Sequence, residues 1–241
     1  MAGADEAGRG SLAGPLVAAG VLFDYESLSL SDRRTLAGLH DSKQLDPEAR
    51  EALYPCVLRA ASRVAVTVRA VRGIDSRGLH NTNLEALATS LARVHCEGAV
   101  CLSDGFRLGS RCPVEHRAVV DGDATSAAIA AASVIAKVTR DRCMRRAHDS
   151  YPDWGFNVNV GYSTPEHREA IVRNGISAIH RRSFASIAYT QLELAGGDIP
   201  AELLEGGADM VELEEIAARL EADADDVEAD LAEPRDVAAA G

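Results

Sequence analysis

Four acidic residues of this sequence are spaced so that they could act together on one substrate. Asp5 and Glu6 are adjacent near the start of the sequence. Asp104 ends a short apolar stretch, and Asp123 follows another one. Each acid lies at or just beyond the end of a strand-like segment, and strand ends along one edge of an open sheet are where active sites are often built. The spacing therefore predicts that the four carboxylates meet, although each one alone is most often a turn or capping residue.

Carboxylates gathered at one place favour metal chemistry. They cannot all stay ionised close together unless a cation is present. Oxygen ligands without His or Cys favour Mg²⁺ or Mn²⁺ over zinc, and two such ions commonly support in-line attack on a phosphodiester. The sequence shows no Ser, Cys or His constellation typical of a nucleophilic enzyme. We therefore expect two divalent ions, Mn²⁺ or Mg²⁺, at this cluster.

These acids need a sheet to position them, and the rest of the sequence predicts one. We expect a short strand around the first two acids and further strands at 15–23, 64–71, 98–104 and 117–120. Helices are expected at 47–60, 83–95, 125–148 and 165–173, the last with Thr164 as its N-cap. This order indicates an α/β fold in which helices flank one central mixed sheet and a helical appendage follows.

The charge of the chain is distributed unevenly. The 241 residues carry a net charge of −12, yet residues 198–241 hold 15 acidic and 2 basic residues, a net of −13. Residues 1–197 are thus near neutral, at +1. We predict a catalytic domain at 1–197 and an acidic, mobile tail at 198–241. The apolar stripe 213–231 could dock onto a protein partner or the tail could compete with substrate, but the simpler interpretation is a solubilising tail.

Several classes of protein are excluded by composition. The apolar runs fall short of the roughly 18–20 residues that a membrane helix needs, and a signal-peptide pattern is absent from the sequence. The five cysteines form neither a CxxC pair nor a zinc-site spacing. We therefore expect a cytoplasmic protein with reduced thiols, not attached to membranes and monomeric.

Short motifs along residues 2–189 follow the order of one known family. They are DEAGRG at 5–10, GP at 14–15, DSK at 41–43, DG at 104–105, GD at 122–123, AASVIAKVTRD at 131–141, GYST at 161–164 and HRRSF at 180–184. In these motifs the sequence resembles ribonuclease HII. The resemblance implies an RNase H-like fold and a metal-dependent endonuclease. It would cut the RNA strand of RNA–DNA hybrids and cleave at single ribonucleotides embedded in duplex DNA.

The resemblance also implies roles for single residues. The four carboxylates would bind the metal ions and carry out catalysis. Gly8, Arg9 and Gly10 would read the ribonucleotide, because glycine lets the backbone approach the sugar and the 2′-OH distinguishes RNA from DNA. Tyr162 would pack against that sugar, although the ring alone would be interpreted as a core or rim aromatic. The candidates for phosphate contacts are Lys43, Lys137, Arg181 and Arg182.

A polar face of the predicted helix at 125–148 has two interpretations. Ser133, Lys137 and Arg140 are spaced i, i+4, i+7 and so share one face. With the resemblance, this is the face that carries the phosphate candidate Lys137, whereas without it the three residues form a solvated stripe. His167 and His180 are interpreted as structural residues.

Two departures and two alternatives complete the sequence-based prediction. Asp121 and Val160 stand where the family commonly has basic residues, which removes positive charge from the expected substrate path. Ribonuclease HIII is a related alternative, but it typically has a different residue in place of Arg9. A catalytically silent nucleic-acid-binding module of the same fold is the other alternative, and loss of a carboxylate would be its mark.

Overall fold

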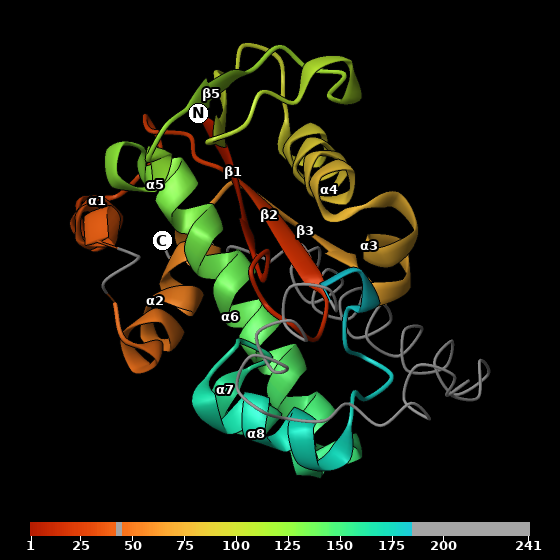
Figure 1. The fold of residues 1–241 in the computed structure, drawn as a ribbon. Coiled ribbons are helices and arrows are strands. Elements are labelled where there is room, and N and C mark those ends of the chain that lie inside the picture. Colours follow the sequence, from red (N-terminus) through yellow and green to blue (C-terminus); the bar gives the residue numbers. More distant parts are fainter. Residues whose placement is uncertain (42–44, 185–241) are drawn as a thin grey trace.

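The computed structural model describes residues 1–41 and 45–184 of the chain (Figure 1). Lys43, the acidic tail at 198–241 and the predicted domain boundary at 197 lie outside the described residues. The predicted C-terminal appendage can be compared with the structure only up to residue 184. None of the helices in residues 1–41 and 45–184 combines the length and the apolar character that a membrane span requires.

A five-stranded mixed sheet forms the centre of the described residues, in the order β3-β2-β1-β4-β5. Its strands are β1 (Ala2–Ala7), β2 (Leu16–Leu22), β3 (Arg63–Arg69), β4 (Cys101–Asp104) and β5 (Arg117–Val119). β1 lies in the middle, antiparallel to β2 and parallel to β4. The predicted mixed sheet is therefore confirmed, and the first two acids lie within its central strand.

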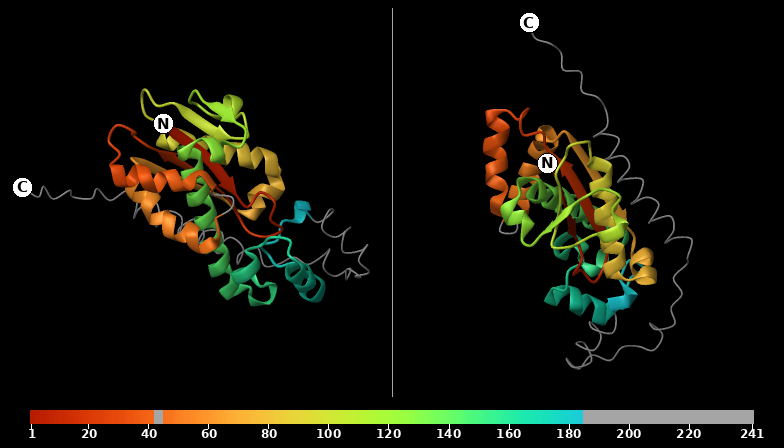
Figure 2. Two further views of the ribbon diagram at one scale, coloured as in Figure 1. Left: turned by 90° about the vertical axis from the view of Figure 1, so that its left-hand side faces the viewer. Right: turned by 90° about the horizontal axis from the view of Figure 1, so that it is seen from above.

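Helices cover both faces of this sheet (Figure 2). They are α1 (Leu30–Ala37), α2 (Pro47–Ala60), α3 (Val71–Arg77), α4 (Leu79–Val94), α5 (Gly122–Thr125), α6 (Ala127–Ser150), α7 (Phe156–Asn159) and α8 (Pro165–Asn174). Short 3₁₀ helices lie at Gly38–Asp41, Gly109–Arg111, Pro152–Trp154 and Arg182–Phe184. One buried core joins the sheet to α6, α2 and α1, and a second joins its other face to α4 and α3.

Alternation along β1 decides which core each of its residues enters. Successive side chains of a strand point to opposite faces. Ala2 and Ala4 pack in the core beneath α4, whereas Ala7 packs in the core beneath α6. α6 approaches the sheet closely because Gly3 has no side chain: a Cβ there would lie 2.4 Å from the Ala128 carbonyl carbon. The Ala-rich helix predicted from the sequence thus lies directly against β1, the strand that contains Asp5 and Glu6.

A third, smaller core forms where α7 and α8 pack near the C-terminal end of α6 (Figure 1). It contains Met144, Phe156 and Ile179, with Trp154 at its margin. α8 begins as predicted, because the Thr164 hydroxyl accepts a hydrogen bond from the backbone of the first turn. This end of the molecule brings the GYST segment to the loop that follows β1.

Candidate active site

The central strand places two acids next to each other on opposite faces of the sheet. Asp5 and Glu6 occupy consecutive positions of β1 and pair with Ala19 and Ala18 of β2. The strand-end prediction is slightly wrong here, because both acids lie inside the strand, before its last residue. Asp5 is only 6% exposed, and its Oδ1 accepts a hydrogen bond from the Glu6 backbone at 2.8 Å.

The neighbouring parallel strand adds the other two acids. β1 and β4 pair Ala4 with Ser103, so Asp104 follows at the level of Asp5. The Asp104 Oδ1 accepts a hydrogen bond of 2.7 Å from the Gly122 backbone amide, which fixes the turn after β5. Asp123 comes next in this turn and is buried. The topology therefore brings Asp5, Glu6 and Asp104 together, and it places Asp123 one residue beyond the amide that Asp104 binds.

Burial and mutual repulsion make Asp5 and Glu6 hold their protons more tightly than free carboxyl groups do. Burial raises the pKa of Asp5 from 3.8 to about 8, with further increases from the charges of Glu6 and Asp104. Burial likewise raises the pKa of Glu6 from 4.5 to about 7, against a smaller lowering by the Arg9 charge. The mutual influence shows that three of the carboxyl groups lie within electrostatic range of one another. A bound cation would replace these protons.

The donor set of this cluster fits a hard divalent cation. All of its ligating atoms are carboxylate oxygens, which suit Mg²⁺ and Mn²⁺. The Glu6 Oε2 is buried without a hydrogen-bond partner among the described residues. Asn83 of α4 lies beside Glu6 and lowers its pKa, although neither amide atom has good hydrogen-bonding geometry. Across residues 1–41 and 45–184, no three His, Cys, Asp or Glu side chains are already arranged as a set that could hold a metal ion.

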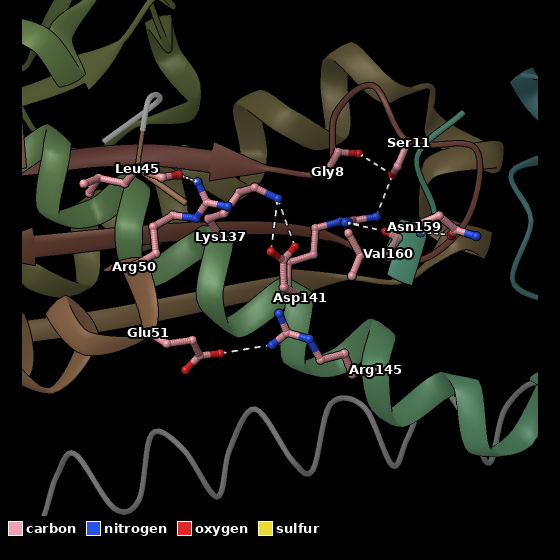
Figure 3. Close-up of polar contacts among 12 residues, drawn as sticks. Gly8, Ser11, Leu45, Arg50, Glu51, Lys137, Asp141, Arg145, Asn159 and Val160 are labelled. Carbon is pink, nitrogen blue, oxygen red and sulfur yellow. Dashed lines mark hydrogen bonds and ion pairs between the residues drawn. The ribbon is translucent and has the colours of Figure 1, made fainter. Parts of the chain in front are cut away.

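The Gly8-Arg9-Gly10 turn follows β1 directly and is shaped by a positive φ. Gly8 has φ of +86°, and a Cβ at this position would lie 2.0 Å from the Arg140 Nε. The Gly8 carbonyl accepts a hydrogen bond from the Ser11 hydroxyl at 2.8 Å (Figure 3). The Arg9 side chain is exposed, and its guanidinium lies 4.5 Å from the ring centroid of Phe106. The turn thus presents an arginine beside the carboxylates.

Two buried arginines stabilise this turn and the loop after it by hydrogen bonds, and the sequence did not indicate this role for them. Arg140 of α6 is 0% exposed and donates to the carbonyls of Pro15, Ala13 and Val160 at 2.9–3.0 Å. It also donates to the Ser11 hydroxyl at 2.7 Å. The interpretation of this helix face as a solvated stripe is therefore wrong at Arg140. Its partners are backbone groups far away in the sequence, which no local pattern reveals.

Arg181 is the second buried arginine, and its predicted phosphate contact is corrected by the structure. The side chain is 2% exposed and donates to the carbonyls of Gly14, Pro15 and Arg9 at 2.9–3.2 Å. Its donors are therefore used within the protein. Arg182, in contrast, is exposed, while its backbone amide donates to Asp75 at 3.0 Å. Arg182 remains a candidate for phosphate contact, and Lys43 lies outside the described residues.

Tyr162 contacts two cationic side chains of α6 at the edge of the same region. Lys137 Nζ and the Arg140 guanidinium carbon are each 5.0 Å from its ring centroid, and the ring is half-buried. Lys137 also forms an ion pair of 3.0 Å with Asp141, one helical turn further along α6 (Figure 3). The Gly161 carbonyl accepts a hydrogen bond from the Leu12 backbone at 2.8 Å. Tyr162 is thereby joined to the loop after β1.

Comparison with known proteins identifies the family of this arrangement. The sequence profile of the family described as Ribonuclease HII matches residues 2–187. The chain belongs to the ribonuclease HII family. Ribonuclease HII of Rhizobium johnstonii is 43% identical over 193 residues, covering 79% of this chain and 80% of its own length. Ribonuclease HII of Geobacillus kaustophilus is 43% identical over 187 residues, covering 78% of this chain and 68% of its own.

Solved structures agree with membership of the ribonuclease HII family. The ribonuclease H2 of Pyrococcus horikoshii superposes with a TM-score of 0.66 at 27% identity, covering 80% of this chain and 98% of its own. The ribonuclease HII in a complex with PCNA from Archaeoglobus fulgidus gives a TM-score of 0.66 at 28% identity, and the match covers 77% of this chain and 94% of the other. A ribonuclease HIII solved in complex with Mn²⁺ shares the fold at 21% identity, with a TM-score of 0.62.

Family membership confirms the predicted fold and the general activity. A protein of the ribonuclease HII family is a metal-dependent ribonuclease, a hydrolase with the RNase H-like fold. The alternatives of ribonuclease HIII and of a catalytically silent binding module are set aside. The roles of the single carboxylates and of the substrate-binding residues remain predictions.

Proposed function

We propose that this ribonuclease hydrolyses the RNA strand of RNA–DNA hybrids and cleaves at single ribonucleotides embedded in duplex DNA. Attack on the phosphate 5′ of the ribonucleotide–DNA junction leaves 5′-phosphate and 3′-hydroxyl ends. The observation that carries this proposal is the cluster of carboxylates on the central strands, where burial and mutual repulsion raise the pKa of Asp5 to about 8 and of Glu6 to about 7. Such a cluster is typical of a cation site beside a phosphodiester.

The proposed cofactors are two divalent ions, Mn²⁺ or Mg²⁺. Asp5 and Asp104 would hold both ions from adjacent strands, and Glu6 and Asp123 would complete the two ligand sets. When bound, the ions supply an activated water and stabilise the negative charge that develops on the phosphate. The four carboxylates would position the ions, and Asp5 and Glu6, whose pKa values are raised, would give up their protons on binding.

Substrate recognition is proposed to depend on the sugar and phosphate rather than on the bases. Gly8, Arg9 and Gly10 offer backbone groups and one cation beside the carboxylates, and Tyr162 offers a half-buried ring. This combination suits a 2′-OH and a sugar face, not the edge of one particular base. Lys137 and Arg182 are the proposed phosphate contacts within the described residues.

A cleavage assay with one embedded ribonucleotide tests the proposal. The wild-type protein with Mg²⁺ or Mn²⁺ should cut this duplex and a hybrid, leave an all-DNA duplex intact, and lose activity in EDTA. Asp5→Asn should nearly abolish cleavage, whereas Asp121→Asn should retain it, because the Asp121 side chain is exposed and Asn also tolerates its φ of 49°. Activity of Asp5→Asn near that of wild type would refute the assignment.

The recognition of the sugar has its own test. Cleavage should be similar with each of the four ribonucleotides, within the roughly 1–3 kcal/mol that one good base contact would contribute. Tyr162→Phe should reduce cleavage less than Tyr162→Ala, since the ring face is the proposed contact. Strong preference for one base would contradict the proposal.

The remaining expectations concern assembly and location. We propose a cytoplasmic monomer, with the acidic tail at 198–241 as the segment available to a protein partner. Light scattering on the purified full chain measures the oligomeric state directly, and a dimer at micromolar concentration would contradict the proposed monomer.

A further inference from the structure

Two buried histidines outside the carboxylate cluster contact each other near Tyr162. His167 of α8 is 0% exposed and His180 is 4% exposed. Their Nε2 atoms lie 3.1 Å apart. Phe156 packs against both rings, with centroid distances of 5.5 and 5.7 Å. The catalytic chemistry proposed above uses neither histidine.

The partners of the two rings determine where their protons lie. The Ser177 backbone amide can only donate, and it lies 2.9 Å from His180 Nδ1, which must therefore accept. The Tyr162 carbonyl can only accept, and it lies 2.8 Å from His167 Nδ1, which must therefore donate. Neutral His180 then carries its proton on Nε2 and donates it to the bare Nε2 of His167.

The result is a directed relay of hydrogen bonds, from Ser177 through His180 and His167 to the Tyr162 carbonyl. Every link has one donor and one acceptor, and the Ser177 hydroxyl adds a second donor to His180 Nδ1 at 2.7 Å. An additional proton on either ring would place two N–H groups against each other. Burial also opposes an additional proton: it lowers the pKa of His180 to about 3 and the pKa of His167 below its usual range.

The segment at the end of this relay needs support from its surroundings. Val160 has φ of 42° and Gly161 has φ of 83°. Positive φ at a β-branched residue such as Val160 is strained and persists only when neighbouring contacts enforce it. Arg140 holds the Val160 carbonyl at 2.9 Å, and the relay holds the Tyr162 carbonyl two residues later. The cation–π contacts of the half-buried Tyr162 ring with Lys137 and Arg140 add to this support.

We propose that His167 and His180 are positioning residues that fix Tyr162 beside the scissile phosphate through its carbonyl group. This inference rests on the proposed role of Tyr162 in substrate binding. It extends that role to two neutral imidazoles that touch neither substrate nor metal. Removal of the His167 link frees the strained turn, and the ring no longer stays in its productive place.

A double-mutant cycle measures whether His167 acts through Tyr162. His167→Leu should lower kcat on the single-ribonucleotide duplex by about 10- to 100-fold, as for a catalytic contact displaced by about 1 Å, with little change in KM. In the Tyr162→Ala background the same substitution should have almost no further effect on kcat. Additive losses would show that His167 acts elsewhere and would overturn the proposal.

Two further variants separate positioning from stability. His167→Asn keeps an N–H donor where His167 Nδ1 lies, so it should restore kcat to near wild type although its melting temperature is lower. Ile179→Ala removes apolar contacts from the same core without breaking a relay link. It should lower the melting temperature and leave kcat unchanged. Equal kcat losses in all three variants would overturn the proposal.

The tautomers can be observed directly in the wild-type protein, whether or not His167→Leu folds. A long-range ¹H–¹⁵N spectrum at pH 7 should show His167 protonated only on Nδ1 and His180 only on Nε2. Any other pair of protonation states would overturn the relay. The proposed function fails separately, if the wild-type protein does not cleave the single-ribonucleotide duplex. Cleavage by wild type with no loss in Tyr162→Ala would refute only the positioning role.

Discussion

Replacing Asp5 by Asn should stabilise the metal-free protein while removing its activity. The pKa of Asp5 rises on folding from 3.8 to about 8, so between these pH values the folded state binds a proton that the unfolded state has lost. Stability in EDTA therefore falls as pH rises through this window, by up to about 1.4 kcal/mol per pH unit. At pH 7 the buried Asp5 carboxyl group therefore lowers the free energy of unfolding by at most about 4 kcal/mol relative to its value at low pH.

Asparagine avoids this cost because it has no charge to bury and keeps the oxygen that accepts from the Glu6 backbone. Relaxation of the site reduces the gain, and we expect about 1–3 kcal/mol at pH 7. For a chain of this size, that raises the melting temperature in EDTA by roughly 2–10 °C. The stability of the variant should also depend less on pH between 5 and 8.

Thermal unfolding with and without metal ions provides the assay. In EDTA, Asp5→Asn should have a higher melting temperature than wild type. With millimolar Mn²⁺ this difference in melting temperature should shrink or change sign, because only the wild-type protein is stabilised by binding the ion. Asp121→Asn, at an exposed carboxylate, serves as the matched control and should behave as wild type in both buffers. A lower melting temperature of Asp5→Asn in EDTA would refute the reasoning that repulsion and burial strain this cluster.

The affinity for Mn²⁺ should rise with pH up to about 8 and then level off, because Asp5 and Glu6 have raised pKa values and must lose their protons before they bind the ion. Calorimetric titration from pH 6 to 9 measures this affinity, and an affinity that does not change with pH would contradict the prediction. Arg140→Lys should lower the free energy of unfolding by about 2–4 kcal/mol in urea titrations, because one ammonium group cannot reach all the backbone carbonyls that the guanidinium group binds. A decrease of less than about 0.5 kcal/mol would show that these hydrogen bonds are dispensable. Truncation after Gly197 should leave KM unchanged at both 0.01 M and 0.15 M salt, where the Debye length is about 30 Å and about 8 Å. A lower KM of the truncated protein at low salt alone would instead show that the acidic tail competes with nucleic acid.

The sequence predicted the elements whose residues carry a strong local pattern. α6 was expected at 125–148 and is found at Ala127–Ser150, because a run rich in Ala and free of Gly and Pro favours helix whatever surrounds it. α1 and α3 were not predicted. α1 is largely polar, and α3 contains Gly73 in its middle. Tertiary contacts hold α3, since Ile74 is buried and Asp75 accepts from the backbone amides of Arg182 and Ser183.

The candidate site was predictable in its acids but not in its supports. Adjacent acids on an apolar strand are visible in one sequence, as at Asp5 and Glu6. The acceptors of Arg140 and Arg181 are backbone carbonyls, which no residue type marks. Arg181 was predicted to contact phosphate because its charge is visible in the sequence and its burial is not.

The central place of β1 has a consequence for how the enzyme is made. β1 is translated before its partner β4, and Asp5 and Asp123 are 118 residues apart in the sequence. At about 5–20 residues per second, the ribosome needs roughly 6–24 s to join them in one chain. Until β4 is synthesised, the nascent protein has only two of the four predicted metal-binding acids and no parallel neighbour for β1. We therefore expect that ribosome-bound chains ending before β4 cannot cleave nucleic acid, so that the nuclease becomes active only after most of its sheet is synthesised.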